Sequence, residues 1–305
     1  MPSVSIIVNV CNGAATLQEA LQSALAQTCT DWEMIVWDDR STDESTAIVS
    51  TFADPRIRYF LAPQQTPLGQ ARDAAIHEAR GEWLAFLDQD DIWLPHKLEQ
   101  QLALDTSASV SLIYGRTLDF DPDGSERDHD YFHEFELLPE GDISGELLGR
   151  GCFIAMSSAM IRRSEVLATG TIPDEISITP DYFLYVAVGS RCEARAVQNV
   201  VCRCRLHRGS MTRTYRRESL EETLWLVDHF RQRLPAKVYR DRCKHIATAL
   251  AVEELRHPAT FASGVRRLVK QGSVAWLVSR PFVHLWRRIR RRVRRPYWKM
   301  SAGAS

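Results

Sequence analysis

Apolar runs and helical spacings alternate through the first hundred residues of the chain. Residues 4–10 form a near-continuous apolar run, as expected for a strand that is buried on both faces. Residues 16–26 then place leucines and alanines on one side of a helix. The pattern continues with strands predicted at 33–37, 57–61 and 83–87, and with helices that begin at Asp43 and span 68–79. Strands separated by helices indicate right-handed βαβ crossovers and a mainly parallel sheet, that is, an α/β fold.

Beyond residue 105 the pattern is less regular. Residues 119–146 are acidic and predict a hairpin followed by a loop, and 152–161 and 193–206 predict further strands. From Glu218 onward, apolar positions recur at helical spacing. We therefore expect one domain over 1–215, with halves at 1–105 and 106–215, and a helical C-terminal region over 216–305.

Charge divides the chain in two. The 305 residues are 45% hydrophobic and 25% charged, which is ordinary globular composition and excludes disordered and collagen-like classes. The net charge of −1 hides 27 acidic against 9 basic residues in 1–150, and 12 against 29 in 151–305. An acidic front half suits a cation site, and a basic back half suits an anionic surface or ligand.

The cysteines, the N-terminus and the late apolar stretch indicate in which cellular compartment the protein is expected. The seven cysteines are scattered without a CxxC pair, and Cys202 and Cys204 are same-face residues of a predicted strand. This usage argues against a zinc ribbon or a disulfide framework and favours a reducing compartment. The N-terminus has no basic region followed by an apolar stretch, and the apolar stretch 274–286 is broken by Arg280 and Pro281. We expect a cytoplasmic protein without a signal peptide or a membrane span.

Carboxylates follow several of the predicted strands. The first strand ends at Cys11-Asn12-Gly13, the second at Asp38-Asp39, and the fourth at residues 88–91 with the sequence DQDD. In open α/β sheets, ligands bind beyond the carboxyl ends of the strands. Five carboxylates are therefore expected at one edge of the sheet.

The segment Asp88-Gln89-Asp90 is a DxD motif. Two carboxylates around a turn can hold Mg²⁺ or Mn²⁺ and leave positions open for water and phosphate. The alternative is that these aspartates decorate a turn and cap the helix that starts near Pro95. The chain has no GxGxxG after its first strand, no GxxxxGK[ST] and no HExxH. His129 and His133 lie among acids, Pro and Gly, which favours a solvated loop over a metal site.

Four segments of the chain resemble glycosyltransferase family 2. They are VSIIVNVCN, LQEALQSALAQT, DWEMIVWDDRSTDES and LGQARDAAIHEARGEWLAFLDQDDIWLPHKL, and they occur in the family's order and spacing. The resemblance covers residues 3–105 closely and 150–212 more loosely. It implies the GT-A fold, a Rossmann-like sheet flanked by helices. It further implies an inverting, metal-dependent transferase that uses a nucleotide-sugar, with 1–105 as the nucleotide-binding half and 106–215 as the acceptor half.

The resemblance also implies roles for individual residues. Asp90 matches the principal ligand of Mn²⁺ or Mg²⁺, and Asp88 lies near both the ribose and the metal. Asp181 in SITPDYFLYVAV matches the catalytic base, or alternatively caps the helix that follows it. Trp93 occupies either an acceptor-side position or the core. The remaining implied nucleotide contacts are Asn12, Asp38, Asp39, Arg72, His207 and Arg208.

Three positions depart from the family pattern. Cys11 replaces an aromatic residue near the base, Asp73 replaces an asparagine, and Pro180 replaces the glutamate that usually precedes the base. The departures leave room for an alternative function, a catalytically silent module that binds a nucleotide-sugar or a polyanion. The retention of Asp39, Asp90 and Asp181 together favours the enzyme.

The chemistry of sugar transfer explains why such residues are needed. An acceptor hydroxyl becomes a good nucleophile when a base removes its proton, the role implied for Asp181. The departing nucleoside diphosphate gains charge, which a cation on Asp90 would stabilise. The resemblance implies inversion through a single displacement, with a UDP-sugar as the favoured donor.

The segment 284–299, HLWRRIRRRVRRPYWK, is strongly basic and amphipathic. Leu285, Ile289 and Val293 form an apolar stripe among seven arginines and one lysine. Such a helix can lie on an anionic membrane, or alternatively pack on the acidic domain. Nucleic-acid binding fits the charge but no other feature. Membrane contact would suit a saccharide or lipid-linked saccharide acceptor at the inner face of the plasma membrane, as in bacterial surface polysaccharide synthesis.

Overall fold

The computed structural model describes residues 2–121, 123–128, 135–206, 211–256 and 259–270. The predictions for His129, His133, His207, Arg208 and the basic segment 284–299 lie outside these residues. The chain divides into two compact units. One comprises Met1–Thr214 with Phe230–Leu234, and the other Tyr215–His229 with Pro235–Ser305.

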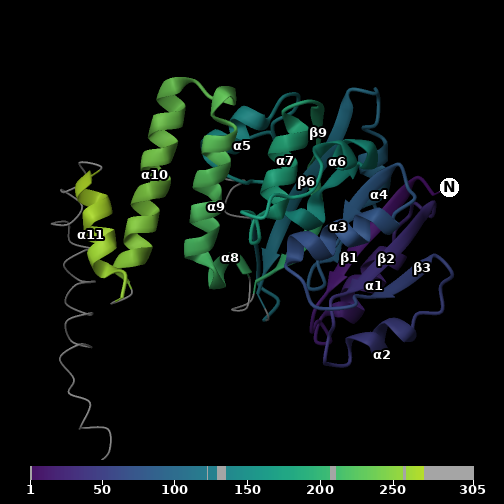
Figure 1. The fold of residues 1–305 in the computed structure, drawn as a ribbon. Coiled ribbons are helices and arrows are strands. Elements are labelled where there is room, and N and C mark those ends of the chain that lie inside the picture. Colours follow the sequence, from purple (N-terminus) through teal and green to yellow (C-terminus); the bar gives the residue numbers. More distant parts are fainter. Residues whose placement is uncertain (1, 122, 129–134, 207–210, 257–258, 271–305) are drawn as a thin grey trace, which may run out of the picture. The chain divides into compact units, whose positions relative to one another are not determined.

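A nine-stranded sheet forms the centre of the first unit (Figure 1). Its strand order is β3-β2-β1-β4-β8-β6-β9-β5, with β7 paired to β6. The four parallel strands that open the chain are β1 (Val4–Val10), β2 (Trp32–Asp38), β3 (Ile57–Leu61) and β4 (Trp83–Phe86). The remaining strands are β5 (Ile92–Trp93), β6 (Val110–Phe120), β7 (Glu126–Asp128), β8 (Met160–Arg162) and β9 (Glu193–Arg205). The predicted α/β fold with a mainly parallel first half is confirmed.

Two details of the second half differ from the sequence prediction. The strand predicted over 152–161 is wrong, because only β8 is extended there and a 3-10 helix at Met156–Ser158 precedes it. The buried strand β6 was not predicted, although it pairs with β7, β8 and β9. Its mixture of apolar, Thr, Arg and Asp residues lacks a clear two-residue alternation. The predicted hairpin is confirmed by the pairing of β6 with β7. The described residues 135–143 lead into α5 (Ser144–Arg150).

Helices cover both faces of the sheet. Val4, Ile6 and Val8 of β1 share a core cluster with Leu17 and Leu21 of α1. The helices that contribute to this cluster are α1 (Leu17–Leu25), α2 (Ser45–Ser50) and α4 (Lys97–Leu102). The opposite face carries α3 (Leu68–Glu78), which packs on β1 and β2, and α7 (Pro180–Gly189), which packs on β6 and on α6 (Arg163–Thr169). The strands β1, β2 and β4 are thus buried on two sides, which explains their continuous apolar runs, whereas β3 at the edge of the sheet is only partly buried.

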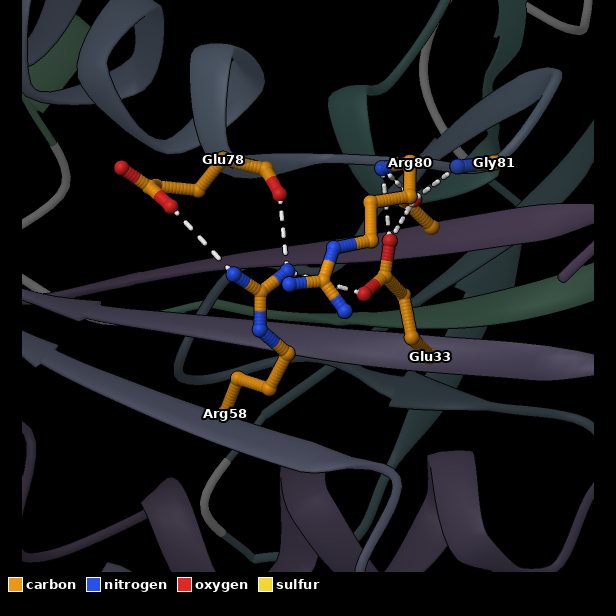
Figure 2. Close-up of polar contacts among 6 residues, drawn as sticks. Glu33, Arg58, Glu78, Arg80 and Gly81 are labelled. Carbon is orange, nitrogen blue, oxygen red and sulfur yellow. Dashed lines mark hydrogen bonds and ion pairs between the residues drawn. The ribbon is translucent and has the colours of Figure 1, made fainter. Parts of the chain in front are cut away.

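A polar network fastens the amino ends of the strands (Figure 2). Glu33 accepts hydrogen bonds from the Ser5 hydroxyl at 2.8 Å and the Arg80 N–H at 2.6 Å, and pairs with Arg58 at 3.0 Å. Burial alone would raise the pKa of Glu33, but these bonds outweigh it and lower the pKa. Gly81 is required beside them, because a Cβ there would lie 2.5 Å from the Ser5 nitrogen. The network joins β1, β2, β3 and the end of α3, and so fixes the register of the strands whose opposite ends form the site.

The second unit is helical. It contains α9 (Arg216–His229), α10 (Ala236–Leu255) and α11 (Phe261–Lys270), with α10 packed against both others. Ala251, Leu255 and Leu268 form a small core between α10 and α11. Among the described residues, no helix combines the length and the apolar composition needed to cross a bilayer.

Candidate active site

The carboxyl ends of β1, β2 and β4 meet at one edge of the sheet. The N–H of Asp39 donates to the Val10 carbonyl at 2.8 Å, and the N–H of Leu87 donates to the Ile7 carbonyl at 3.0 Å. These bonds continue the strand pairing to the point where each strand ends. The segments that follow the three strands therefore lie side by side, as the sequence predicted.

Asp38, predicted as a nucleotide contact, lies inside the protein at the end of β2. The residue is fully buried, and its carboxylate accepts hydrogen bonds from the Ser41 N–H at 2.7 Å, the Tyr59 hydroxyl at 2.8 Å and the Thr46 hydroxyl at 3.1 Å. Both oxygens are thus engaged inside the protein. Asp38 thus holds the loop after β2 in place, and its direct contact with a nucleotide stays a prediction.

Asn12 and Asp39 connect neighbouring loops at this edge. Asn12 adopts a positive φ of 52°, which asparagine tolerates well, and its side-chain oxygen accepts the Thr42 N–H at 2.8 Å. Asp39 is 6% exposed and accepts the Thr66 N–H on both oxygens at 3.1 Å. Asp39 is therefore an acceptor for an N–H donor beside the end of β1.

Gln89, the middle residue of the DxD motif, clamps the end of β1. Its side-chain oxygen accepts the Cys11 N–H at 3.0 Å, and its amide nitrogen donates to the Cys11 carbonyl at 3.3 Å. A Cβ at position 13 would lie 2.3 Å from the Gln89 oxygen, so Gly13 is needed for the clamp to close. No local pattern indicates this role, because x in a DxD motif is unrestricted.

Three carboxylates gather at the end of β4. Asp88 lies 3.4 Å from the guanidinium of Arg72, which is 4% exposed on α3. Burial raises the pKa of Asp88 to about 6, Arg72 opposes this shift, and the nearby charges of Asp90 and Asp181 add to it. The 44% exposure of the Asp88 side chain shows that solvent still reaches it. The structure thus brings together Arg72, Asp88, Asp90 and Asp181 from α3, the DxD segment and α7.

This carboxylate group fits a hard divalent cation. Oxygen ligands are those that Mg²⁺ and Mn²⁺ prefer, and two protein carboxylates commonly suffice when phosphate and water complete the shell. Burial is the main cause of the raised pKa of Asp88, and the repulsion from Asp90 and Asp181 that adds to it is the kind that a bound cation relieves.

Asp181 lies in the first turn of α7, after Thr179 at the N-cap and Pro180 at the first helical position. Proline suits that position because its fixed φ is helical and no N–H is needed there. Asp181 is half-buried. The pKa values of Tyr185 and Cys152 are raised mainly by the burial of these two residues and next by the nearby charge of Asp181. The carboxylate also lies where it interacts favourably with the helix dipole. Its position is compatible with both predicted roles, base and helix terminus.

Comparison with known proteins decides the family. The model of the family described as "Glycosyl transferase family 2" matches residues 5–169, more than half of the chain. The chain belongs to this family. The resemblance that the sequence segments carry is confirmed, and the protein is a glycosyltransferase.

Two relatives show how far the similarity extends. The chain is 38% identical over 112 residues to the Escherichia coli UDP-Glc:alpha-D-GlcNAc-diphosphoundecaprenol beta-1,3-glucosyltransferase WfgD, a match that covers 37% of this chain and 44% of that protein. It is 28% identical over 311 residues to the succinoglycan biosynthesis protein ExoO of Rhizobium meliloti, covering 97% of this chain and 87% of ExoO. The chain therefore spans less than half of the first relative and most of the second.

Solved structures agree on the fold. TarS 1-349 of S. aureus in complex with UDP-GlcNAc matches with a TM-score of 0.60 at 16% identity, covering 93% of this chain and 78% of that one. The mannosyltransferase PcManGT from Pyrobaculum calidifontis, in complex with GDP-Man and Mn²⁺, matches with a TM-score of 0.61 at 16% identity, covering 93% and 82%. The predicted GT-A fold is confirmed.

Trp93 of the glycosyltransferase lies in the core. It is 2% exposed, and its indole N–H donates to the Ser157 carbonyl at 2.7 Å. A ring in this position offers no face to an acceptor, so of the two sequence interpretations the structure fits the core residue.

Two residues that support the glycosyltransferase site were missed by sequence reasoning. The Ser157 hydroxyl accepts the Asp88 N–H at 3.0 Å. Arg205 of β9 donates from Nε to the Asp90 carbonyl at 3.0 Å and from its backbone N–H to the Asp91 carboxylate at 2.9 Å. Both hold the backbone of the DxD segment from positions far away in sequence, which no local motif reveals.

Proposed function

We propose that the protein is an inverting, cation-dependent glycosyltransferase that moves a sugar from a UDP-sugar to a hydroxyl of a lipid-linked saccharide. The observation that carries this proposal is the gathering of Asp88, Asp90 and Asp181 beside Arg72 at the edge of the sheet. In a silent binding module Asp181 would serve only as the acidic residue in the first turn of α7, so the turnover of Asp181→Asn separates the two functions.

Asp39 is the proposed contact for the base of the nucleotide. In the structure it accepts the Thr66 N–H at 3.1 Å on each oxygen. The imide N–H of uracil is a donor of the same kind, so a bound uridine would take over part of this hydrogen bonding. Asn12 and Asp38 support the two loops between which the base would lie. Arg72, with His207 and Arg208 from the sequence, would counter the charge of the diphosphate.

Asp90 and Asp88 would hold Mn²⁺ or Mg²⁺ together with the diphosphate. When bound, the cation supplies positive charge that stabilises the departing nucleoside diphosphate. Arg72 keeps the Asp88 carboxylate oriented, and the Gln89 clamp together with Arg205 fixes the segment between the two aspartates. The protein therefore presents its carboxylates preformed rather than assembling them on binding.

Asp181 is the proposed base. Its carboxylate would accept the proton of the acceptor hydroxyl as that oxygen attacks the anomeric carbon from the side opposite the leaving group. One such displacement inverts the anomeric centre.

The acceptor class is proposed from the named relatives. WfgD is named for an acceptor that carries GlcNAc on diphosphoundecaprenol, and ExoO for succinoglycan biosynthesis. A lipid-linked acceptor places the reaction at the inner face of the plasma membrane. The basic segment 284–299 has the composition to bind that anionic surface.

The test is a transfer assay with UDP-glucose or UDP-GlcNAc and a synthetic GlcNAc-diphospholipid acceptor, read by NMR of the product's anomeric centre. We expect a product of inverted configuration, and we expect Asp181→Asn to lose at least about 100-fold in turnover with UDP binding unchanged. Asp241→Asn, at an exposed ion pair of α10, is the matched control. Retained configuration, or full turnover in Asp181→Asn, would overturn the mechanism. UDP binding without turnover on any acceptor would favour the silent module.

A further inference from the structure

A second cluster of potential metal ligands lies behind the DxD segment. The carboxylate of Asp91 and the thiols of Cys202 and Cys204 each offer a ligand atom, and these three atoms all lie within 4.8 Å of one another. Asp91 immediately follows the DxD motif, whereas the cysteines are two residues apart on β9 and so project from the same face. The cluster thus joins two segments that lie far apart in sequence.

The three groups are held in place by the fold. Asp91 is 7% exposed and Cys202 is fully buried, while Cys204 is partly accessible. The Arg205 N–H donates to Asp91 at 2.9 Å, and Cys202 pairs with Trp93 in the β5–β9 register. Ligands fixed in this way lose little conformational entropy on binding an ion. The partial exposure of Cys204 leaves a side from which an ion can enter.

Charge around the cluster also suits a divalent cation. Asp119, which is 3% exposed, stands opposite Cys204 in the β6–β9 register. Lys97 is 1% exposed, and its Nζ lies 4.1 Å from the centre of the Trp93 ring. Trp93 is the residue that pairs with Cys202 between β5 and β9. One divalent cation with two thiolates and the Asp91 carboxylate carries a net charge of −1, and Asp119 brings a second carboxylate to the cluster. Lys97, whose pKa is lowered to about 7 by burial, offsets part of this negative charge. Formation of the complex releases the two thiol protons to solvent.

Ligand chemistry selects the metal. Thiolates are soft ligands that favour zinc over magnesium or manganese. A tetrahedral zinc ion with Zn–S bonds of about 2.3 Å keeps its ligand atoms roughly 3.5–3.8 Å apart, within reach of the observed arrangement by small side-chain rotations. We propose that Asp91, Cys202 and Cys204 bind a zinc ion, with water in the fourth position, at a site separate from the proposed Mn²⁺ or Mg²⁺ position on Asp88 and Asp90.

Such a site would have a structural consequence for catalysis. Asp91 is covalently next to Asp90, so a zinc ion on Asp91 would tie the DxD segment to β9. The Arg205 side chain makes the same connection by its bond to the Asp90 carbonyl at 3.0 Å. The metal would reinforce this link, and the inference stands independently of which sugar is transferred.

The experiment uses cobalt as a spectroscopic probe for zinc. The full chain, stripped with a chelator and kept under a phosphine reductant, is titrated with Co²⁺. We expect a thiolate-to-cobalt charge-transfer band that saturates at one equivalent. One equivalent of Zn²⁺ should abolish it, and a large excess of Mg²⁺ should leave it intact. We also expect zinc to raise the melting temperature by about 5 °C.

Substitutions identify the residues that give rise to the charge-transfer band. Cys202→Ser and Cys204→Ser should each lose it, whereas Cys29→Ser, a matched cysteine elsewhere, and Asp90→Asn should retain it. Absence of the band in the wild type, its persistence in both serine variants, or its loss in Cys29→Ser would overturn the proposal. Because Cys202 is buried and its variant is at risk of misfolding, X-ray absorption of the zinc-loaded wild type provides a second test. A shell with two sulfur atoms supports the site, and a shell of oxygen and nitrogen alone refutes it.

Discussion

Asp38→Asn tests whether this residue supports the loop, as the structure shows, or contacts the nucleotide, as the sequence predicted. The carboxylate accepts hydrogen bonds at 2.7, 2.8 and 3.1 Å from Ser41, Tyr59 and Thr46, inside a fully buried environment. Asparagine keeps the shape of the side chain but removes its charge. The Tyr59 and Thr46 hydroxyls can reorient toward the new amide, so the bonds become neutral rather than absent.

The expected magnitude follows from these three bonds. A hydrogen bond to a charged group contributes about 1.5–3 kcal/mol, and a neutral one about 0.5–1.5 kcal/mol. Replacing three charge-assisted bonds by neutral ones therefore costs about 3 kcal/mol of the free energy of unfolding. Tyr59→Phe removes one partner only and should cost about 1–2 kcal/mol.

The assay pairs urea unfolding with calorimetric titration of UDP and Mn²⁺ under conditions where each variant is folded. We expect Asp38→Asn to lose stability as stated, with UDP affinity within about threefold of the wild type, a change of about 0.65 kcal/mol or less. Unchanged stability combined with a loss of UDP affinity of tenfold or more would refute the loop-supporting role and restore the predicted contact.

Two further predictions concern the DxD segment. The pKa of Asp88 is raised to about 6, so between about pH 4 and 6 the folded protein holds a proton that the unfolded chain has released. In urea unfolding, the free energy of unfolding of the metal-free wild type should therefore fall relative to that of Asp88→Asn as the pH rises from about 4 to 6. A rise in the free energy of unfolding of the wild type relative to the variant would contradict the raised pKa of Asp88. Gln89→Ala removes two hydrogen bonds to Cys11 and should cost about 2 kcal/mol. Gly13→Ala displaces the Gln89 side chain, so the double variant Gly13→Ala/Gln89→Ala should be no less stable than the less stable of the two single variants. Additive losses in the free energy of unfolding would show that Gly13 and Gln89 act separately.

The parallel half of the fold was predictable because its signals are local. Strands β1, β2 and β4 are apolar runs buried on both faces, β3 is a partly buried edge strand, and the helices between them show regular spacing. The general rule for ligand sites at the carboxyl ends of strands then locates the carboxylates from the amino-acid sequence alone. The strand β6 escaped prediction because its partners β8 and β9 lie far away in sequence, so its stability comes from non-local pairing.

The candidate site also contains features that local sequence motifs reveal and features that depend on residues far away in sequence. The positions of Asp88, Asp90 and Asp181 were readable from motifs. The internal hydrogen bonds of Asp38, and the choice between core and acceptor side for Trp93, were not. An aspartate at a strand end looks the same in sequence whether its oxygens face a ligand or three internal donors. Only the loop geometry, which depends on Tyr59 and Thr46, distinguishes the two. Likewise Trp93 is buried through its contact with Ser157, a residue 64 positions away.

The central claim is that the aspartates at this edge of the sheet bind a nucleoside diphosphate together with a divalent cation. Calorimetric titration of UDP, GDP and dTDP, each with and without Mn²⁺, tests it on the wild type and on Asp90→Asn. The account predicts micromolar binding of UDP that requires Mn²⁺ and is lost in Asp90→Asn. Absence of binding by all three nucleotides, or binding that is indifferent both to Mn²⁺ and to the substitution, would contradict it.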